Sequence, residues 1–339
     1  MFVVKRFIRL TYPVLCASAI AIILPIFSDG PHSYFLQEHV TAIEENMWKY
    51  VLHISNFYKI QLSLILHMWI MNAIFQLNII TAPVLFIVDR WRTFGIITMT
   101  LLSLIGFAMN FAILLISDCS VTSGYSFDIE KTLRYLEHIQ MKPYTIHLSS
   151  YCMGLLVGYL LSEGKILKFG KKTSFIFWIC SITLMLFSIY GLHGYTKDIS
   201  PNENIVLLFR VFSTYLWLTG QIWMCIAFTN RGGGAVKRFL SHNVFLILDR
   251  LNVSLYIVHV SIIIYIIACS KKPFYLSIVT LRMLYLFSTL FSIVASFVLY
   301  LFVEAPFNAI FKMIFHKSNS RKTLTQTNNC QLHTMKKYE

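Results

Sequence analysis

The sequence predicts an all-α protein, a polytopic transmembrane helical bundle of about eight spans, and three observations support this. Hydrophobic residues make up 57% of the 339 residues and charged residues only 13%, whereas roughly 25% of the residues of a soluble domain are charged. Apolar runs of about 20 residues, the length that crosses a bilayer as a helix, recur along the chain. Basic residues are concentrated in every second connection between these runs.

The predicted spans coincide with the apolar runs. The second and seventh runs are long enough to tilt or to extend beyond the hydrocarbon layer. We treat residues 1–316 as one transmembrane domain and expect the polar, basic residues 317–339 to form a disordered cytosolic tail. The eight predicted spans are residues 11–28, 62–88, 94–117, 145–161, 174–193, 205–228, 244–269 and 281–303.

The first apolar run has two interpretations. Basic residues followed by an apolar run, with small residues at 17–21, are also typical of a secretory signal peptide. However, the small residues lie inside the run rather than after it, and residues 10–27 have the length of a span. We therefore favour a retained first span; a cleaved signal peptide would leave seven spans.

Lysine and arginine in the short connections predict the orientation. The basic connections belong in the cytosol, which places both termini there and leaves open whether the membrane is the plasma membrane or the endoplasmic reticulum. The basic residues that give the net charge of +14 thus lie in connections that face anionic membrane lipids. We therefore expect no nucleic-acid partner. The basic connections hold Lys5, Arg6, Arg9, Arg90, Arg92, Lys165, Lys168, Lys171, Lys172, Arg231, Lys237 and Arg238; the acidic ones hold Asp29, Glu38, Glu44, Glu45, Asp118, Asp128, Glu130, Glu137, Asp198 and Glu203.

Common catalytic motifs are absent from the sequence. There is no Walker loop, GxGxxG, GxSxG or HExxH motif, and no two cysteines have the spacing of metal ligands. We therefore expect no metal cofactor.

Polar side chains within the predicted spans are candidates for the lining of a central cavity, because ionisable groups inside a bilayer are costly and often functional. Each has an ordinary alternative. Gln76 can bridge helices, Arg210 can extend to the outer interface, Arg250 can reach cytosolic phosphates, and His259 can be a neutral hydrogen-bonding group between helices.

Two further sequence features lie in or at the end of predicted spans, a glutamate and a pair of glycines. Glu304 ends the eighth predicted span, as a functional or an ordinary interfacial residue. Gly154 and Gly158 form a small-xxx-small pattern that predicts a helix-packing face.

Arg6 and Arg9 are three residues apart, so they share one face of a helix at the predicted cytosolic mouth of the first span. Two guanidinium groups there can bind phosphates, such as those of a CoA thioester or of a lipid head group. The alternative is an anchor that obeys the positive-inside rule.

Six segments, in order along about 300 residues, resemble the membrane acyltransferase-3 family, and within it the nose-resistant-to-fluoxetine type of animals. They are Lys5-Arg6-Phe-Ile-Arg9-Leu-Thr-Tyr-Pro13, similar to R-x-x-R-L-x-P; Ser28-Asp-Gly-Pro31 with Asn46-Met-Trp48 and Ile54-Ser-Asn-Phe-Tyr58; Met68-Trp69 with Gln76 and Pro83; Lys142-Pro143-Tyr144 with Gly154 and Gly158-Tyr159; Arg250-Leu-Asn-Val-Ser-Leu-Tyr256-Ile-Val-His259; and Phe302-Val-Glu304-Ala-Pro-Phe307.

The resemblance implies an integral-membrane O-acyltransferase that moves an acyl group, usually from cytosolic acyl-CoA, to a hydroxyl acceptor on the far side of the membrane. Arg6 and Arg9 would bind the acyl-CoA co-substrate. Relative to the family pattern, we expect the first two helices, and the base histidine on one of them, to be missing. The pattern's acidic residue aligns with Ile74 and one of its arginines with His147.

Two functions therefore remain open. One is acyl transfer, with His259 as a weak candidate for the base; the other is non-catalytic lipid handling or transport.

Overall fold

The structure is a computed structural model that describes residues 2–30, 33–59, 63–117, 129–163, 169–193, 202–230, 233–271 and 277–315. Within these ranges, eight helices are long and apolar enough to cross a membrane, which confirms the predicted fold class and number of spans. The predicted tail, residues 317–339, lies outside the described residues. The eight helices are Phe2–Phe27, Leu66–Arg90, Arg92–Ile116, Pro143–Ser162, Lys171–Tyr190, Asn204–Thr229, Asn243–Ala268 and Ile278–Phe315.

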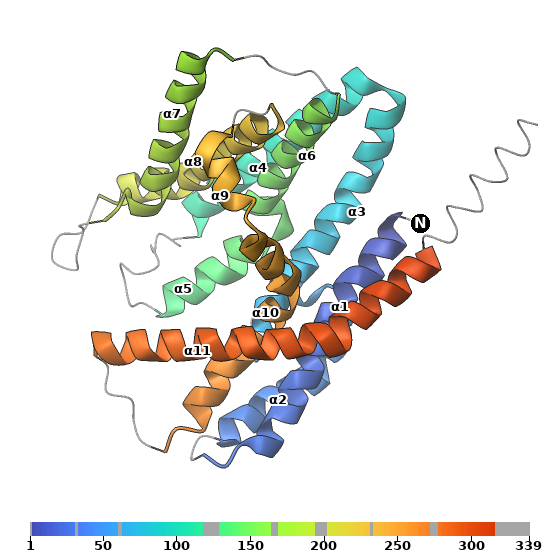
Figure 1. The fold of residues 1–339 in the computed structure, drawn as a ribbon, viewed down its shortest axis with the longest axis vertical. Coiled ribbons are helices and arrows are strands. Elements are labelled where there is room, and N and C mark those ends of the chain that lie inside the picture. The colour runs from blue at the N-terminus through green and yellow to red at the C-terminus, as the bar shows by residue number, and fades with distance from the viewer. Residues whose placement is uncertain are drawn as a thin grey trace, which may run out of the picture. The chain divides into compact units, whose positions relative to one another are not determined.

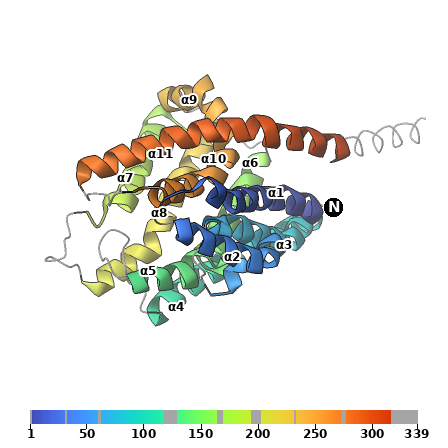
Figure 2. The same ribbon diagram turned by 90° about the horizontal axis from the view of Figure 1, so that it is seen from below.

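The chain divides into two compact units. Unit 1 comprises Met1–Ile26 and Tyr34–Phe245, and unit 2 comprises Phe27–Ser33 and Leu246–Glu339. In unit 1, α1 packs against α3, α3 against α4, α4 against α6, and α7 against α8 (Figures 1 and 2). The helices of unit 1 are α1 (Phe2–Ile23), α2 (Ser33–Val51), α3 (Trp69–Arg90), α4 (Arg92–Ile116), α5 (Ile129–Tyr135), α6 (Leu148–Ser162), α7 (Lys171–Tyr190), α8 (Glu203–Thr229) and α9 (Gly234–Leu240).

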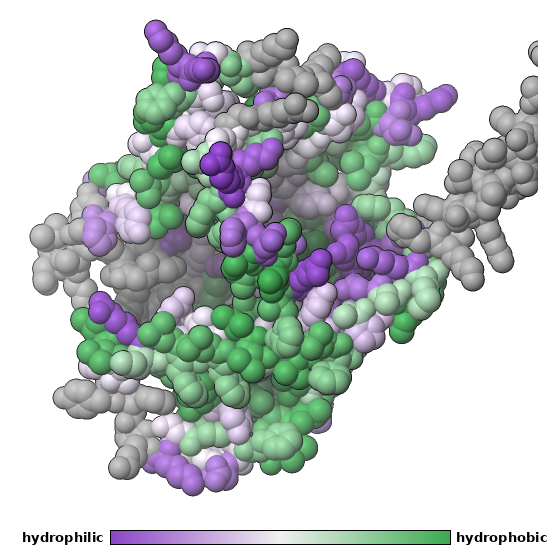
Figure 3. Space-filling view, in the orientation of Figure 1, coloured by the Kyte–Doolittle hydropathy of each residue, from purple (hydrophilic) through white to green (hydrophobic). Residues whose placement is uncertain are grey.

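Unit 2 contains most of α10 (Asn243–Ala268) and the last long helix. That helix comprises α11 (Ile278–Leu299) and the π-helical turn η6 (Tyr300–Glu304), and it continues to Phe315. Hydrophobic side chains cover much of the face of α11 shown in Figure 3. An exposed apolar face is the expected surface of a helix in contact with lipid.

The structure differs from the predicted spans at both ends of the chain. The first helix begins at Phe2, nine residues earlier than predicted, so the basic residues near the N-terminus belong to it. The last helix continues to Phe315 rather than ending near residue 303. In both places polar residues interrupt the hydropathy pattern, whereas backbone hydrogen bonding continues through them.

α2 is a helix where the sequence predicts only a connection. Its buried side chains include Leu36, Val40, Ile43 and Tyr50, which recur with the spacing of one helical face. Acidic residues occupy much of the remaining surface, so the segment is amphipathic rather than uniformly apolar. A search for apolar runs of span length therefore misses it.

The predicted packing role of Gly154 and Gly158 is wrong within the described residues. A Cβ atom placed at either position would have no neighbour within 4 Å. The close approach in this part of unit 1 is instead made by Gly106 of α4, where a Cβ would lie 2.7 Å from the backbone nitrogen of Ser149 in α6. Gly158 lies on the opposite side of α6 from Ser149.

Replacing Gly106 with alanine is expected to destabilise unit 1, because the added methyl group forces α4 and α6 apart. Overpacking of this kind costs about 1–3 kcal/mol. The measurement is the thermal unfolding midpoint of the purified protein in detergent, with Gly158→Ala as the matched control. Equal midpoints for the two variants would contradict the assigned helix contact.

Candidate functional site

A non-helical segment between α2 and α3 forms the centre of the candidate site. It contains two short 3-10 turns, η2 (Ser55–Phe57) and η3 (Leu66–Met68). His53, at its start, has a positive φ of 57°, a backbone conformation that is uncommon for residues other than glycine but is enriched for histidine. A residue held in this conformation needs support from its surroundings.

Side chains of α1 and α3 supply that support. Asn72 donates a hydrogen bond from Nδ2 to Ser55 Oγ at 2.6 Å, so its Oδ1 accepts from His53 Nδ1–H at 3.0 Å. His53 Nε2 then accepts from the hydroxyl of Thr11, also at 3.0 Å. His53 and Asn72 are fully buried, and the ring of Phe75 lies against the imidazole.

Burial lowers the pKa of His53, and the hydrogen bond to Asn72 offsets only part of this effect. The imidazole is therefore neutral at pH 7, with one defined tautomer. In this state Thr11, His53 and Asn72 can all satisfy their hydrogen bonds inside the protein.

A second group of hydrogen bonds connects the segment to α3 and to the start of the helix at residue 143. The amides of Asn56 and Gln76 bond to each other in both directions, at 2.8 and 2.9 Å. Their remaining N–H groups donate to the carbonyl oxygens of Met141, at 2.9 Å, and His53, at 2.6 Å. Lys142 donates from Nζ to the carbonyl oxygen of Asn56 at 2.7 Å, and burial lowers the pKa of this amine.

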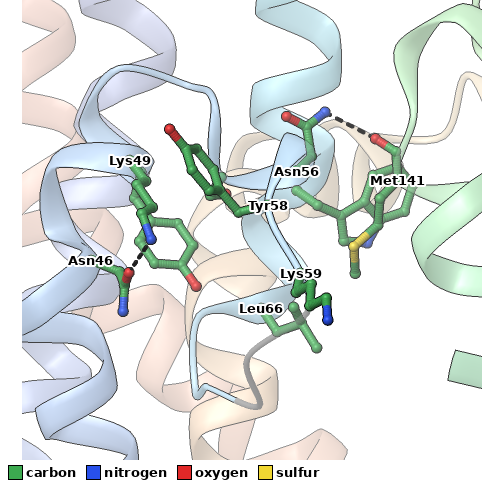
Figure 4. A pocket seen from close by; sticks show the side chains of 10 residues that line it. Asn46, Lys49, Asn56, Tyr58, Lys59, Leu66 and Met141 are labelled. Carbon is green, nitrogen blue, oxygen red and sulfur yellow. Dashed lines mark hydrogen bonds between the residues drawn. The ribbon is translucent and has the colours of Figure 1, made fainter.

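These bonds form one wall of a cavity of about 260 Å³, which we call the α2–α3 pocket. The ammonium group of Lys49 lies 4.4 Å from the centre of the Tyr58 ring and donates to Asn46 Oδ1 (Figure 4). On the α2 side of the pocket, Tyr50 and Ser63 share a hydrogen bond of 2.9 Å. The pocket is lined by Asn46, Lys49, Tyr50, Ser55, Asn56, Tyr58, Lys59, Leu66, Trp69 and Met141.

Arg6 and Arg9 lie within α1, and both are exposed. The helix places them on one face and Thr11 on roughly the opposite face. Phe7, between them in sequence, lies 5.4 Å from the ring of Phe75. Since Phe75 is about 22 Å from the end of α3 at 1.5 Å per residue, this part of α1 is level with the first half of α3 rather than with its basic end.

The four predicted cavity residues occupy different surroundings. Gln76 belongs to the hydrogen-bonded wall, one layer behind the α2–α3 pocket. The Arg210 guanidinium lies 4.6 Å from the Tyr135 ring. Arg250 is exposed on α10, and His259 Nδ1–H donates to the carbonyl oxygen of Tyr256 at 2.9 Å. Because the four are divided between the two units, their common cavity remains a prediction.

Glu304 does not end a helix, which corrects its predicted location. It is buried within unit 2 and accepts a hydrogen bond from the hydroxyl of Ser254 on α10. A carboxyl group paired in this way belongs to the packing of α10 against the last helix, and its interpretation as a functional or an interfacial residue remains a prediction.

Sequence reasoning did not identify His53, Asn72 or Lys49 as site residues. One signal was available, because Asn72 and Gln76 are four residues apart in an apolar helix and so share a face. No pattern in the sequence identifies which residues of the connection before α3 meet that face.

Comparison with known proteins agrees with the resemblance in sequence. A family model described as an acyltransferase domain, of the acyltransferase-3 family, matches residues 1–301. Nose resistant to fluoxetine protein 6 of Caenorhabditis elegans is 29% identical over 203 residues, which are 57% of this chain and 24% of that protein. The chain thus matches about a quarter of that relative's length. No solved structure gives a significant match.

The neutral His53 predicts a pH dependence of stability. The folded-state pKa lies below the ordinary 6.5, so the unfolded chain binds more protons as the pH falls below about 6.5. The contribution of His53 to the free energy of unfolding is complete above this pH. It decreases as the pH falls toward the folded-state pKa, by at most about 1.4 kcal/mol per pH unit.

The measurement is the thermal unfolding midpoint between pH 7.5 and pH 5 for the wild type and for two variants. The test variant is His53→Asn, because asparagine tolerates a positive φ. The control is His138→Gln, because the side chain of His138 is exposed. We expect a smaller decrease for His53→Asn than for the other two proteins. Three parallel profiles would show that His53 is not the group that titrates.

Proposed function

Because the chain belongs to the acyltransferase-3 family and has eight helices suited to crossing a membrane, we propose that it is an integral-membrane O-acyltransferase. In this proposal it transfers an acyl group from acyl-CoA to a hydroxyl acceptor. Acyl-CoA, the acceptor and the side of the membrane on which each binds are parts of the proposal.

One observation supports this function most directly, namely that α1 has two different polar faces. One face presents Arg6 and Arg9, while Thr11 on the other face bonds to His53 in the network behind the α2–α3 pocket. A single helix thus connects two cationic groups suited to a phosphate-bearing donor with a pocket suited to an acceptor.

The donor side depends on the arginine pair. Guanidinium groups bind phosphate oxygens through paired hydrogen bonds, and CoA thioesters contain several phosphates. With the cytosolic N-terminus that the basic connections predict, Arg6 and Arg9 would hold the donor from the cytosolic side.

The transfer itself requires a nucleophile and a base. The acceptor oxygen forms a bond to the thioester carbonyl carbon, the carbon–sulfur bond breaks, and CoA leaves as a thiolate. The proton of the acceptor hydroxyl passes to the base and then to the thiolate. His259 donates from Nδ1, so Nε2 is the ring nitrogen that would take the proton, and His259 remains the candidate base.

We assign His53 a positioning role. Its imidazole connects to the α2–α3 pocket through Asn72 and Ser55, and an amide side chain does not relay protons in the way that an imidazole does. His53 would fix the shape of the segment that forms the pocket wall.

A second function, non-catalytic lipid handling or transport, is favoured by one observation. Among the residues that the structure describes, the lining of the α2–α3 pocket includes neither a histidine nor a carboxylate that could act as a base. A pocket of this composition is also suited to binding a ligand without chemical change.

Replacing both Arg6 and Arg9 with glutamine is expected to weaken acyl-CoA binding by about 10- to 100-fold, the loss of one or two charge-assisted hydrogen bonds. The measurement is binding of radiolabelled acyl-CoA to the full chain in nanodiscs. The matched control is Lys171→Gln with Lys172→Gln, two exposed cations at the start of α7.

Unchanged binding in the arginine variant would refute the donor site. Binding by the wild type without release of CoA, when membrane lipids are offered as acceptors, would favour the second function over acyl transfer.

A further inference from the structure

We propose that the α2–α3 pocket recognises an oxyanion, a carboxylate or a phosphate, on a small ligand that also has an apolar part. Identifying this ligand with the acceptor rests on the proposed acyl transfer, whereas recognition of the anion does not. The proposal follows from the charges, the surfaces and the size of the pocket.

The charges of the lining have one sign. Lys49 from α2 and Lys59 from the following segment both line the pocket (Figure 4), and none of the other described residues of the lining is acidic. Among the described residues, no carboxylate lies within ion-pairing distance of either ammonium group. Two cations in a partly enclosed site favour an anion and disfavour a cation.

Lys49 is held in place for such a ligand. Its stem is half-buried, and its ammonium group lies over Tyr58 and donates to Asn46. An ammonium group has three N–H donors, and the described residues use one of them. A cation fixed by its neighbours loses little side-chain entropy when it binds a ligand.

The amide of Asn56, a neutral polar group of the wall, already uses both of its donors. Both N–H groups of the Asn56 amide donate to Gln76 and Met141, and Ser55 Oγ accepts from Asn72. The two lysines are the charged groups of the described lining, and they select for negative charge.

The remaining lining favours a ligand with an apolar part of limited size. Leu66, Trp69 and Met141 supply apolar and aromatic surface. The cavity of about 260 Å³ is below the roughly 300–1,000 Å³ of sites for drug-sized ligands. It suits a head group or a short amphiphile rather than a whole lipid.

The experiment compares ligands of matched chain length by calorimetry on the full chain in phosphatidylcholine nanodiscs, with empty nanodiscs as the blank. Hexanoate and a short-chain phosphatidate provide the two oxyanions, and hexanol and hexyltrimethylammonium provide the neutral and cationic comparisons. We expect the oxyanions to bind at least about tenfold more tightly than hexanol, as charge-assisted hydrogen bonds would require.

Variants test whether the two lysines cause this preference. Lys49→Gln with Lys59→Gln should abolish it, Lys49→Arg with Lys59→Arg should retain it, and Lys171→Gln with Lys172→Gln should leave it unchanged. Binding of inorganic phosphate by itself would indicate a free anion as the ligand, whereas binding of phosphatidate without inorganic phosphate would indicate a lipid head group.

Equal affinities for hexanol and hexanoate, or an anion preference that survives in the glutamine variant, would overturn the proposal. Acyl-CoA binding is measured on the same samples. If the anion preference is absent but acyl-CoA binding still depends on Arg6 and Arg9, the proposed function stands without the anion site. If the anion preference is present but acyl-CoA binding does not depend on Arg6 and Arg9, only the anion site stands.

Discussion

The paired amides of Asn56 and Gln76 hold a non-helical segment against an apolar helix. Polar backbone groups placed beside apolar helices must find partners within the protein. Here both amides use both of their N–H groups, and together they reach two backbone carbonyl oxygens as well as each other. Lys142 adds a bond to the backbone of Asn56 itself. This arrangement holds a turn that contains a left-handed histidine against α3.

The shape of the α2–α3 pocket follows from this constraint. Because Asn56 is fixed from α3 on one side and from Met141 on another, the neighbouring Ser55 and Tyr58 are fixed with it. α2 contributes Lys49 and Tyr50 to the opposite part of the lining. The polar interior of unit 1 thus has a buried structural part, which contains neutral side chains and Lys142, and an accessible part, which is cationic.

Helix α1 keeps the arginine pair, Arg6 and Arg9, on a different face from the side chain that joins the buried network. Thr11 takes part in the buried network, whereas Arg6 and Arg9 are exposed about half a turn away. A donor held by the arginines would therefore not disturb the hydrogen bonds that shape the pocket. Helix α1 can serve both purposes because the 3.6-residue period places residues only a few positions apart on different faces.

The sequence by itself determined the fold class, the eight helices and the family, because apolar length, charge distribution and motif order are local properties of the chain. It also determined that Arg6 and Arg9 share a face and that Gln76 is a polar residue within a span. Only the tertiary structure decided that α2 is a helix, that Gly106 rather than Gly158 makes a close contact, and that Glu304 is buried against Ser254. The bonds that join His53 to Thr11 and Asn72 connect residues far apart in the chain, so no periodicity or motif spacing specifies them.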